Sequence, residues 1–187
     1  MSSRALFALL LGVVALLRLL EVVVSRARQR ARPEHVVAEP LLFPFMVAVH
    51  AGLIALPLLE VILLDRPLLP LLAALAGGVL LLATMLRVWT LRTIGGAWNV
   101  RVVVPESEQV VVTGPYAWIR HPNYLVVILE VLALPLLHTA WLSALGLSLL
   151  NGFVLWRRIR TEEEALGRLP GWRSAMTERA RLIPGVL

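Results

Sequence analysis

Cysteine is absent from this sequence, which excludes disulfide bonds, thiolate nucleophiles and thiolate metal ligands. Lysine is absent too, so arginine supplies all 18 basic charges. Histidine occurs only 4 times, at scattered positions, so we expect no metal site. Only 16% of the residues are charged and 59% are hydrophobic, which is too apolar for a soluble domain of this length. The composition therefore indicates a polytopic membrane protein.

The formal net charge of +6 raises the question of nucleic-acid binding. The arginines, however, flank apolar segments and do not form one basic face. We therefore expect anionic lipid headgroups as partners and no nucleic acid.

Five apolar segments resemble transmembrane helices, which need about 20 mostly apolar residues. The fourth is short, and Pro135 near its end predicts a tilted, kinked or incompletely spanning helix. No small-residue cleavage site follows the first, so we expect a mature helix and not a signal peptide. The sequence predicts one all-α domain over residues 1–187, with a helical tail and spans at 5–24, 41–64, 68–91, 124–138 and 140–156.

Arginines are concentrated after the first, third and fifth apolar segments, on one side of the membrane if the helices alternate. The positive-inside rule makes that side cytoplasmic, with the amino terminus outside and the carboxyl terminus inside a bacterial inner membrane. Two polar elements then face the cytosol: the connection 92–121 and the tail from Arg157. Any soluble cofactor is expected to bind in this half of the chain, residues 92–187.

The segment GPYAWIRHPNY, residues 114–124, brings polar and aromatic side chains to the start of the fourth apolar segment. Gly114-Pro115 is a turn signal, and Pro122 suits the first position of a helix, where an N–H is not needed. His121 precedes a proline and is therefore expected at the cap of that helix. The simplest interpretation is an interfacial anchor, with Arg120 and the aromatic rings at the headgroup level.

A second polar cluster, RIRTEEEAL at residues 158–166, follows the fifth apolar segment. On a helix, Arg158 and Glu162 are i,i+4 neighbours, as are Arg160 and Glu164, so the simplest interpretation is a salt-bridged helix end. Alternatively, the adjacent carboxylates bind a ligand that carries an ammonium group.

The two clusters occur together with flanking motifs in a recognisable order. Gly-Pro-Tyr at 114–116, Arg-His-Pro-x-Tyr at 120–124, Arg-Ile-x-x-Glu-Glu-x-x-Leu at 158–166 and Arg-Leu-Ile-Pro at 181–184 resemble the isoprenylcysteine carboxyl methyltransferase family. The resemblance covers the chain from Leu91 onward. It implies an integral membrane enzyme that uses S-adenosylmethionine. Phospholipid N-methyltransferases share the Arg-His-Pro and Glu-Glu elements.

A finer resemblance concerns Gly-Gly-Ala-Trp-Asn at 95–99, HPNYLVVILEVLALPL at 121–136 and Asn151. These segments are similar to the branch of the family found beside type III polyketide synthases, which O-methylates long-chain alkylpyrones or alkylphenols. It implies a lipid-like acceptor with an enolic or phenolic hydroxyl, and a functional association with such a synthase. Carboxyl methylation of a prenylated cysteine, N-methylation of a phospholipid and a non-enzymatic scaffold or transporter subunit stay open as alternatives.

The resemblance also implies which residues hold the cofactor. The carboxylates of Glu162 and Glu163 would accept hydrogen bonds from its amino group or its ribose hydroxyls, and aromatic rings would attract its sulfonium. Arg120 would pair with the cofactor carboxylate or with lipid phosphate. The predicted cofactor-binding residues are Val112, Gly114, Tyr116, Arg120, His121, Tyr124, Glu162 and Glu163.

The acceptor is expected near polar residues that follow or interrupt apolar segments. Arg101 beside an enolic oxygen would favour the nucleophilic anion, or else serve as an interfacial anchor. Glu130 is costly in an apolar segment, so it is either a base or a buried partner of Arg87 or Asn151. The candidate catalytic residues are Asn99, Arg101 and Glu130, and the candidate substrate-binding residues are Trp98 and Asn151.

Four more polar residues interrupt the first two apolar segments. Arg18 and Glu21 are three residues apart and are expected to pair with each other. His50 and Glu60 either line an acceptor tunnel or bind a neighbouring helix.

Overall fold

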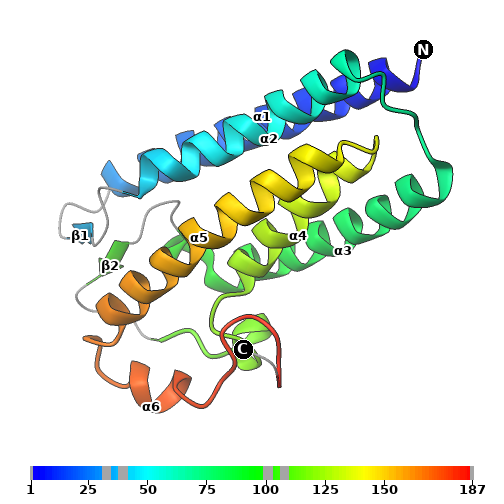
Figure 1. The fold of residues 1–187 in the computed structure, drawn as a ribbon. Helices are drawn as coiled ribbons and strands as arrows, with labels where there is room; N and C mark the ends of the chain where they lie inside the picture. Colours follow the sequence, from blue (N-terminus) through cyan, green and yellow to red (C-terminus); the bar gives the residue numbers. More distant parts are fainter. Residues whose placement is uncertain (1, 31–34, 38–41, 99–102, 106–109, 186–187) are drawn as a thin grey trace.

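The computed structural model describes residues 2–30, 35–37, 42–98, 103–105 and 110–185, and the chain is mainly helical (Figure 1). The long helices are α1 (Ser3–Arg30), α2 (Phe43–Leu63), α3 (Pro70–Ile94), α4 (Pro122–Leu136) and α5 (Trp141–Leu166). The short elements are the 3₁₀ turns Gly95–Ala97 and Gly114–Ala117, helix α6 (Trp172–Met176), and the antiparallel strands β1 (His35–Val37) and β2 (Val103–Pro105).

These long helices confirm the predicted all-α class, since each coincides with one of the five apolar segments. α3 begins at Pro70 because proline favours the first turn of a helix. α5 continues beyond its apolar segment to Leu166, because that extension is rich in Arg, Glu, Ala and Leu, which are good helix formers. The sequence did not predict the small strand pair, because three-residue strands are too short to show alternation.

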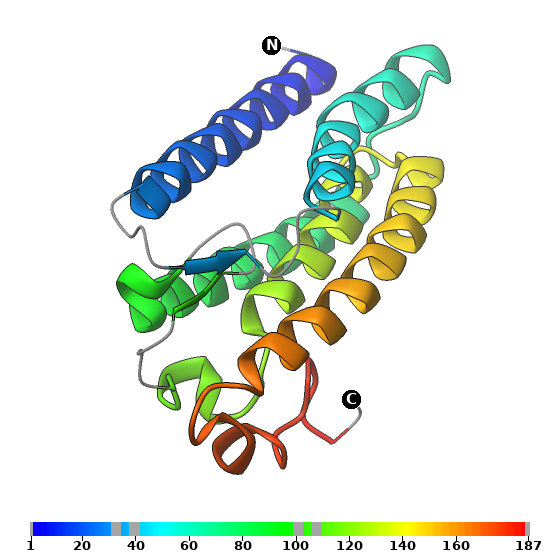
Figure 2. The same ribbon diagram turned by 90° about the vertical axis from the view of Figure 1, so that its left-hand side faces the viewer.

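Each long helix packs mainly against one or two of the others. α2 packs against α1 and α5, and α4 packs against α3 and α5 (Figure 2). Side chains between these helices are buried, among them Leu53 of α2, Val131 of α4 and Leu147 of α5. The core therefore lies between α2, α4 and α5, while α1 and α3 lie at the two ends of this series of contacts.

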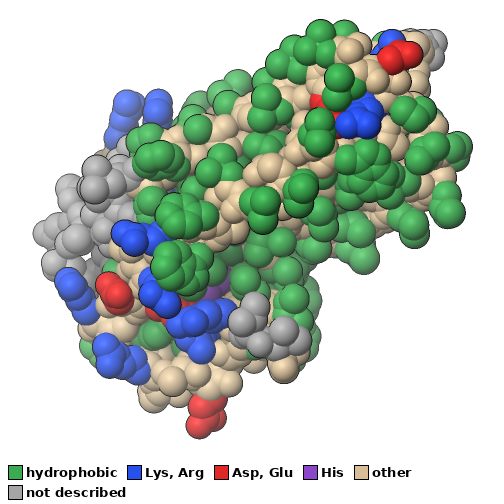
Figure 3. Space-filling model, in the orientation of Figure 1, with side chains coloured by type: hydrophobic (Ala, Val, Ile, Leu, Met, Phe, Trp, Pro, Cys, Tyr) green, Lys and Arg blue, Asp and Glu red, His purple; other side chains and the backbone are tan. Residues whose placement is uncertain are grey.

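Large apolar side chains are exposed along the outside of the bundle, as expected for surfaces in contact with lipid. On the face shown in Figure 3 they cover the length of the helices, whereas arginines gather mainly at the end from which α6 and the tail extend. By length and composition α1, α2 and α3 can each cross a bilayer. α4 has 15 residues and a length of about 22 Å, shorter than a hydrocarbon core of about 30 Å, in agreement with the predicted short span. The chain is an integral membrane protein.

Glu60 stabilises the start of α5. Its carboxylate accepts hydrogen bonds from the backbone N–H and the hydroxyl of Ser143, both at 2.7 Å, and from Arg66 Nε at 3.0 Å. The sequence left open whether Glu60 lines a tunnel or binds a neighbouring helix. In the structure it binds α5.

Two arginines and two glutamates form a closed ring of ion pairs among the helices, which we call the charge ring. Arg18 Nη1 lies 2.6 Å from Glu21 and its Nη2 lies 3.0 Å from Glu130. Arg87 Nη1 lies 2.8 Å from Glu21 and its Nη2 lies 2.8 Å from Glu130. The ring joins α1 to α3 and α4, and it is formally neutral. Charges in an apolar layer are tolerated when they are paired in this way.

The charge ring predicts a measurable effect on stability. Glu130→Gln should lower the free energy of unfolding by about 3–5 kcal/mol, because it leaves two arginines with one carboxylate in an apolar environment. The double variant Arg87→Gln/Glu130→Gln restores neutrality and should lose less. Thermal unfolding in detergent checks both, with the exposed Glu178→Gln as control. An unchanged midpoint for Glu130→Gln would show that the ring does not hold the helices together.

Candidate functional site

The segment before α4 folds as the GPYAWIRHPNY motif predicts. Gly114 opens the 3₁₀ turn with a φ of +56°, and a Cβ at this position would lie 2.4 Å from Thr93 Oγ1 of α3, so only glycine fits. Pro122 is the first residue of α4, and His121 directly precedes it. His121 is only 4% exposed. The segment therefore places a buried imidazole at the start of a membrane helix.

The carboxyl-terminal tail returns to this segment and pairs with it. Ile119 and Ala180 form a parallel β-bridge. The backbone N–H of Arg120 donates to Ala180 O at 2.9 Å, and that of His121 donates to Arg181 O at 3.0 Å. The tail thus covers the start of α4.

Glu163, near the end of α5, binds two guanidinium groups and one imidazole. Its Oε1 accepts from Arg120 Nη1 at 2.9 Å and from His121 Nε2 at 3.1 Å, and its Oε2 accepts from Arg181 Nη2 at 2.9 Å. Burial by itself would raise the pKa of Glu163, but hydrogen bonds from His121 and Arg181 and the charge of Arg120 outweigh it and lower the pKa to about 2. Glu163 therefore joins α4, α5 and the tail.

The neighbouring Glu162 takes part in a different cluster. It accepts a hydrogen bond from the hydroxyl of Tyr124, whose ring stacks on His121 with 5.4 Å between centroids. Arg158 Nε donates to the same hydroxyl at 2.7 Å, and its guanidinium lies 5.6 Å from the centre of the Tyr124 ring. Arg158 and Glu162, four residues apart on α5, thus both bond to the Tyr124 hydroxyl of α4.

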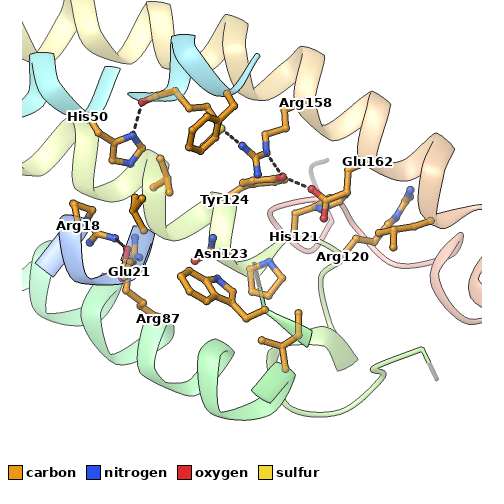
Figure 4. Close-up of a pocket in the computed structure, with 18 of the residues that line it drawn as sticks. Arg18, Glu21, His50, Arg87, Arg120, His121, Asn123, Tyr124, Arg158 and Glu162 are labelled. Carbon is orange, nitrogen blue, oxygen red and sulfur yellow. Dashed lines mark hydrogen bonds and ion pairs between the residues drawn. The ribbon is translucent and has the colours of Figure 1, made fainter. Parts of the chain in front are cut away.

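A cavity of about 600 Å³ extends from this cluster into the space between the helices (Figure 4). All five long helices and α6 contribute to its lining. One part is lined by His121, Tyr124, Arg158 and Glu162, and another by Arg18, Glu21, His50 and Arg87. Its volume falls within the range of about 300–1,000 Å³ that is usual for small-molecule sites. Figure 4 shows Tyr124 with His50 on one side of it and Glu162 on the other.

Most of the predicted cofactor-binding residues meet at this cavity. Glu163 lies behind His121 and holds it by the hydrogen bond described above. Val112 and Gly114 are not among the described lining residues, although Val111 beside them is. Those that line the cavity are Tyr116, Arg120, His121, Tyr124 and Glu162.

The residues predicted for the acceptor and for catalysis are more dispersed. Trp98 lines the cavity, while Asn151 is buried in α5 and does not belong to its described lining. Glu130 is not part of the lining either, and both of its carboxylate oxygens accept hydrogen bonds in the charge ring. Of the two alternatives stated for Glu130, the structure shows the buried partner of Arg87. Asn99 and Arg101 lie outside the described residues.

Sequence reasoning missed two residues of the site. Arg158 belongs to the same motif as Glu162 and precedes it by four residues, so both lie on one face of α5. Asn123 lies inside the Arg-His-Pro-x-Tyr motif at its variable position, which carried no signal. Both line the cavity.

Three buried polar atoms at the cavity have no hydrogen-bond partner in the described part of the chain. They are Arg87 Nε, Trp98 Nε1 and Asn123 Oδ1. Buried groups of this kind are normally paired, so unpaired ones in a cavity point to a polar ligand. The lining fits S-adenosylmethionine, because Glu162 and Asn123 are acceptors for amino and hydroxyl groups while Tyr116 and Trp172 offer aromatic surface. Burial, with a smaller contribution from Glu162, raises the pKa of Tyr116, so its hydroxyl stays protonated.

Comparison with known proteins agrees with this geometry. The model of the isoprenylcysteine carboxyl methyltransferase (ICMT) family matches residues 74–168, which include the start of α4 and the pair Glu162-Glu163. The uncharacterized protein YpbQ of Bacillus subtilis (strain 168) is 31% identical over 163 residues, 86% of this chain and 96% of YpbQ. The chain therefore belongs to the isoprenylcysteine carboxyl methyltransferase family, membrane enzymes whose methyl donor is S-adenosylmethionine.

Proposed function

We propose that this methyltransferase O-methylates a lipid-like acceptor at an enolic or phenolic hydroxyl, such as that of an alkylpyrone or alkylresorcinol. The main observation in support is the single cavity, which combines the polar cluster at the start of α4 with apolar residues of α1 and α2, including Leu19, Val47 and Ile54. A polar cofactor and an acceptor with an alkyl chain therefore find suitable surfaces in one space. The similarity of residues 95–99 and 121–136 to the polyketide-associated branch favours this acceptor class.

In this proposal, the cofactor occupies the part of the cavity formed by the second half of the chain. When bound, it supplies a methyl group on a sulfonium, from which an aligned nucleophile displaces the thioether. Glu162 uses Oε2 for the Tyr124 hydroxyl, so its Oε1 is the oxygen offered to cofactor amino or hydroxyl groups. Trp172 and Met176 of the tail line the same part and exclude water from it.

The proposal assigns different roles to the two adjacent carboxylates. Glu162 lines the cavity and contacts the cofactor. Glu163 orients His121 and holds the tail closed, because its oxygens already bind Arg120, His121 and Arg181. Arg120 donates to Glu163 and to the backbone carbonyl of Arg179, so it too acts on the tail.

We also propose that the arginine-rich end of the bundle faces the cytoplasm of a bacterial cell and that the amino terminus lies outside. Arg26 and Arg92 are exposed near the helix ends of this side, and Arg157 is exposed on the part of α5 that leads to it. By the positive-inside rule such residues are retained on the cytoplasmic side, where the cofactor is made.

Carboxyl methylation of a prenylated cysteine is the second candidate function. The family match favours it, and an apolar cavity wall accepts a prenyl chain as well as an alkyl chain. The two candidates share the cofactor site and differ in the atom that receives the methyl group.

The role of Glu162 predicts a loss of cofactor affinity. Glu162→Gln removes the charge from an acceptor at the cavity and should weaken S-adenosylmethionine binding by about 10- to 150-fold, the loss of one charge-assisted hydrogen bond of about 1.5–3 kcal/mol. Calorimetry in detergent measures it. Glu164→Gln, which neutralises an exposed carboxylate on the same turn, is the matched control and should bind as the unmodified protein does. Equal affinity of both variants would remove Glu162 from the site.

The role of Glu163 predicts an acid-dependent release of the tail. Its folded-state pKa of about 2 lies below the ordinary value of 4.5, so its stabilising effect is complete above pH 4.5 and is lost as the pH falls toward 2. Exchange of the Arg120 and His121 amide protons, corrected for intrinsic rate, should accelerate over this range. In Glu163→Gln the exchange should be fast already at neutral pH. Slow exchange in this variant would mean that the tail is held by other contacts.

The acceptor class is tested by the chemistry of the product. Purified protein should transfer radiolabelled methyl from S-adenosylmethionine to a long-chain alkylpyrone or alkylresorcinol and form an ether that resists mild base. A prenylated cysteine offered in parallel should remain unlabelled. Base-labile label on the prenylated cysteine would establish carboxyl methylation instead.

A further inference from the structure

His50 of α2 lines the part of the cavity that lies near the charge ring. Its Nδ1 lies 2.8 Å from the carbonyl oxygen of Met46, one turn earlier in the helix (Figure 4). A carbonyl oxygen only accepts, so Nδ1 carries the proton and donates it. In the neutral imidazole Nε2 is then unprotonated and basic.

No described residue donates a hydrogen bond to His50 Nε2, although charged groups surround this part of the cavity. They are Arg18 and Glu21 of α1, Arg87 of α3 and Glu130 of α4, all in the charge ring, and Arg158 of α5, which contacts Met46. Arg87 binds its two carboxylates through Nη1 and Nη2. This end of the cavity therefore offers one basic nitrogen beside charges of the ring that are paired with one another.

A basic nitrogen of this kind accepts the proton of a hydroxyl group. We propose that His50 is the general base for the acceptor hydroxyl. This inference rests on the proposed O-methyltransferase function and names the residue that activates the acceptor.

The methyl transfer is balanced with His50 as the base. The acceptor proton moves to His50 Nε2 as an oxygen lone pair forms a bond to the cofactor methyl carbon. The carbon–sulfur bond breaks and its electron pair stays on sulfur, which becomes a neutral thioether. The proton leaves His50 for water after the ether departs.

His50 is suitably placed to act as a base next to the residues that are proposed to bind the cofactor. Met46, four residues or about 6 Å of helix from His50, contacts Arg158, which donates to the Tyr124 hydroxyl. Figure 4 shows His50 on one side of Tyr124 and Glu162 on the other. A hydroxyl bound at His50 therefore lies on the opposite side of Tyr124 from Glu162. Glu130 is not suitable as the base, because arginines occupy both of its oxygens.

The test compares His50→Asn with His138→Asn. The asparagine N–H keeps a donor for the Met46 carbonyl but provides no basic nitrogen. His138 is also a buried histidine, but it lies outside the described lining of the cavity, so its replacement should leave turnover unchanged. S-adenosylmethionine affinity, measured by calorimetry, should be the same in both variants and in the unmodified protein. If the unmodified protein does not bind S-adenosylmethionine, the proposed function itself is refuted.

Two acceptors of different acidity sharpen the test. With a weakly acidic alkylresorcinol, His50→Asn should lower kcat/KM by about 10²- to 10⁴-fold and abolish the fall of kcat/KM on the acid side of the pH profile. With the more acidic enol of an alkylpyrone the loss should be much smaller, because the anion forms without a base. The role of His50 would be overturned if His50→Asn binds the cofactor and methylates both acceptors as fast as the unmodified protein does.

A readout that does not depend on turnover is nitrogen NMR of isotope-labelled histidine. The His50 side chain should show a protonated Nδ1 and an unprotonated Nε2, and added alkylresorcinol should shift the Nε2 signal. The signal should be missing in His50→Asn and present in His138→Asn. A protonated Nε2, or no shift with saturating alkylresorcinol, would refute the inference even if the protein methylates another acceptor.

Discussion

The site depends on one half-buried carboxylate that binds two arginines and one histidine. Glu163 connects the start of α4 through Arg120 and His121, the end of α5 through its own backbone, and the tail through Arg181. Without this carboxylate, three positive or polar donors would meet at the membrane surface with nothing between them. Charge-assisted hydrogen bonds of this kind are stronger than neutral ones, and they fix orientation as well as distance. The imidazole of His121, the Tyr124 ring stacked on it and the closed tail all follow from this arrangement.

The neighbouring Glu162 serves a different purpose because of helix geometry. Consecutive residues on an α-helix point about 100° apart, so two adjacent carboxylates leave the helix in different directions. Glu162 faces the cavity and Glu163 faces the tail. In the proposed function, one glutamate of the pair contacts the cofactor and the other holds the tail over the start of α4.

The charge ring has a comparable double effect deeper in the bundle. Its four ion pairs satisfy the charges that α1, α3 and α4 bring into an apolar layer. Arg18, Glu21 and Arg87 of the ring also line the cavity beside His50. A structural requirement of the membrane helices therefore places paired charges next to the proposed base. The same ring explains why Glu130, although ionisable, is unavailable as a base.

The sequence by itself determined the five helices and the place where α4 starts, because hydropathy, proline and glycine act within a few residues of chain. It also identified the motifs that bring His121, Tyr124 and Glu162 to one cavity, since their order and spacing resemble those of the isoprenylcysteine carboxyl methyltransferase family. Only the tertiary structure decided that Arg158 bonds to Tyr124 across the bundle, that Glu130 belongs to a four-membered ring, and that Asn123 and His50 face the cavity. These outcomes depend on which helix faces pack together, which local sequence does not specify.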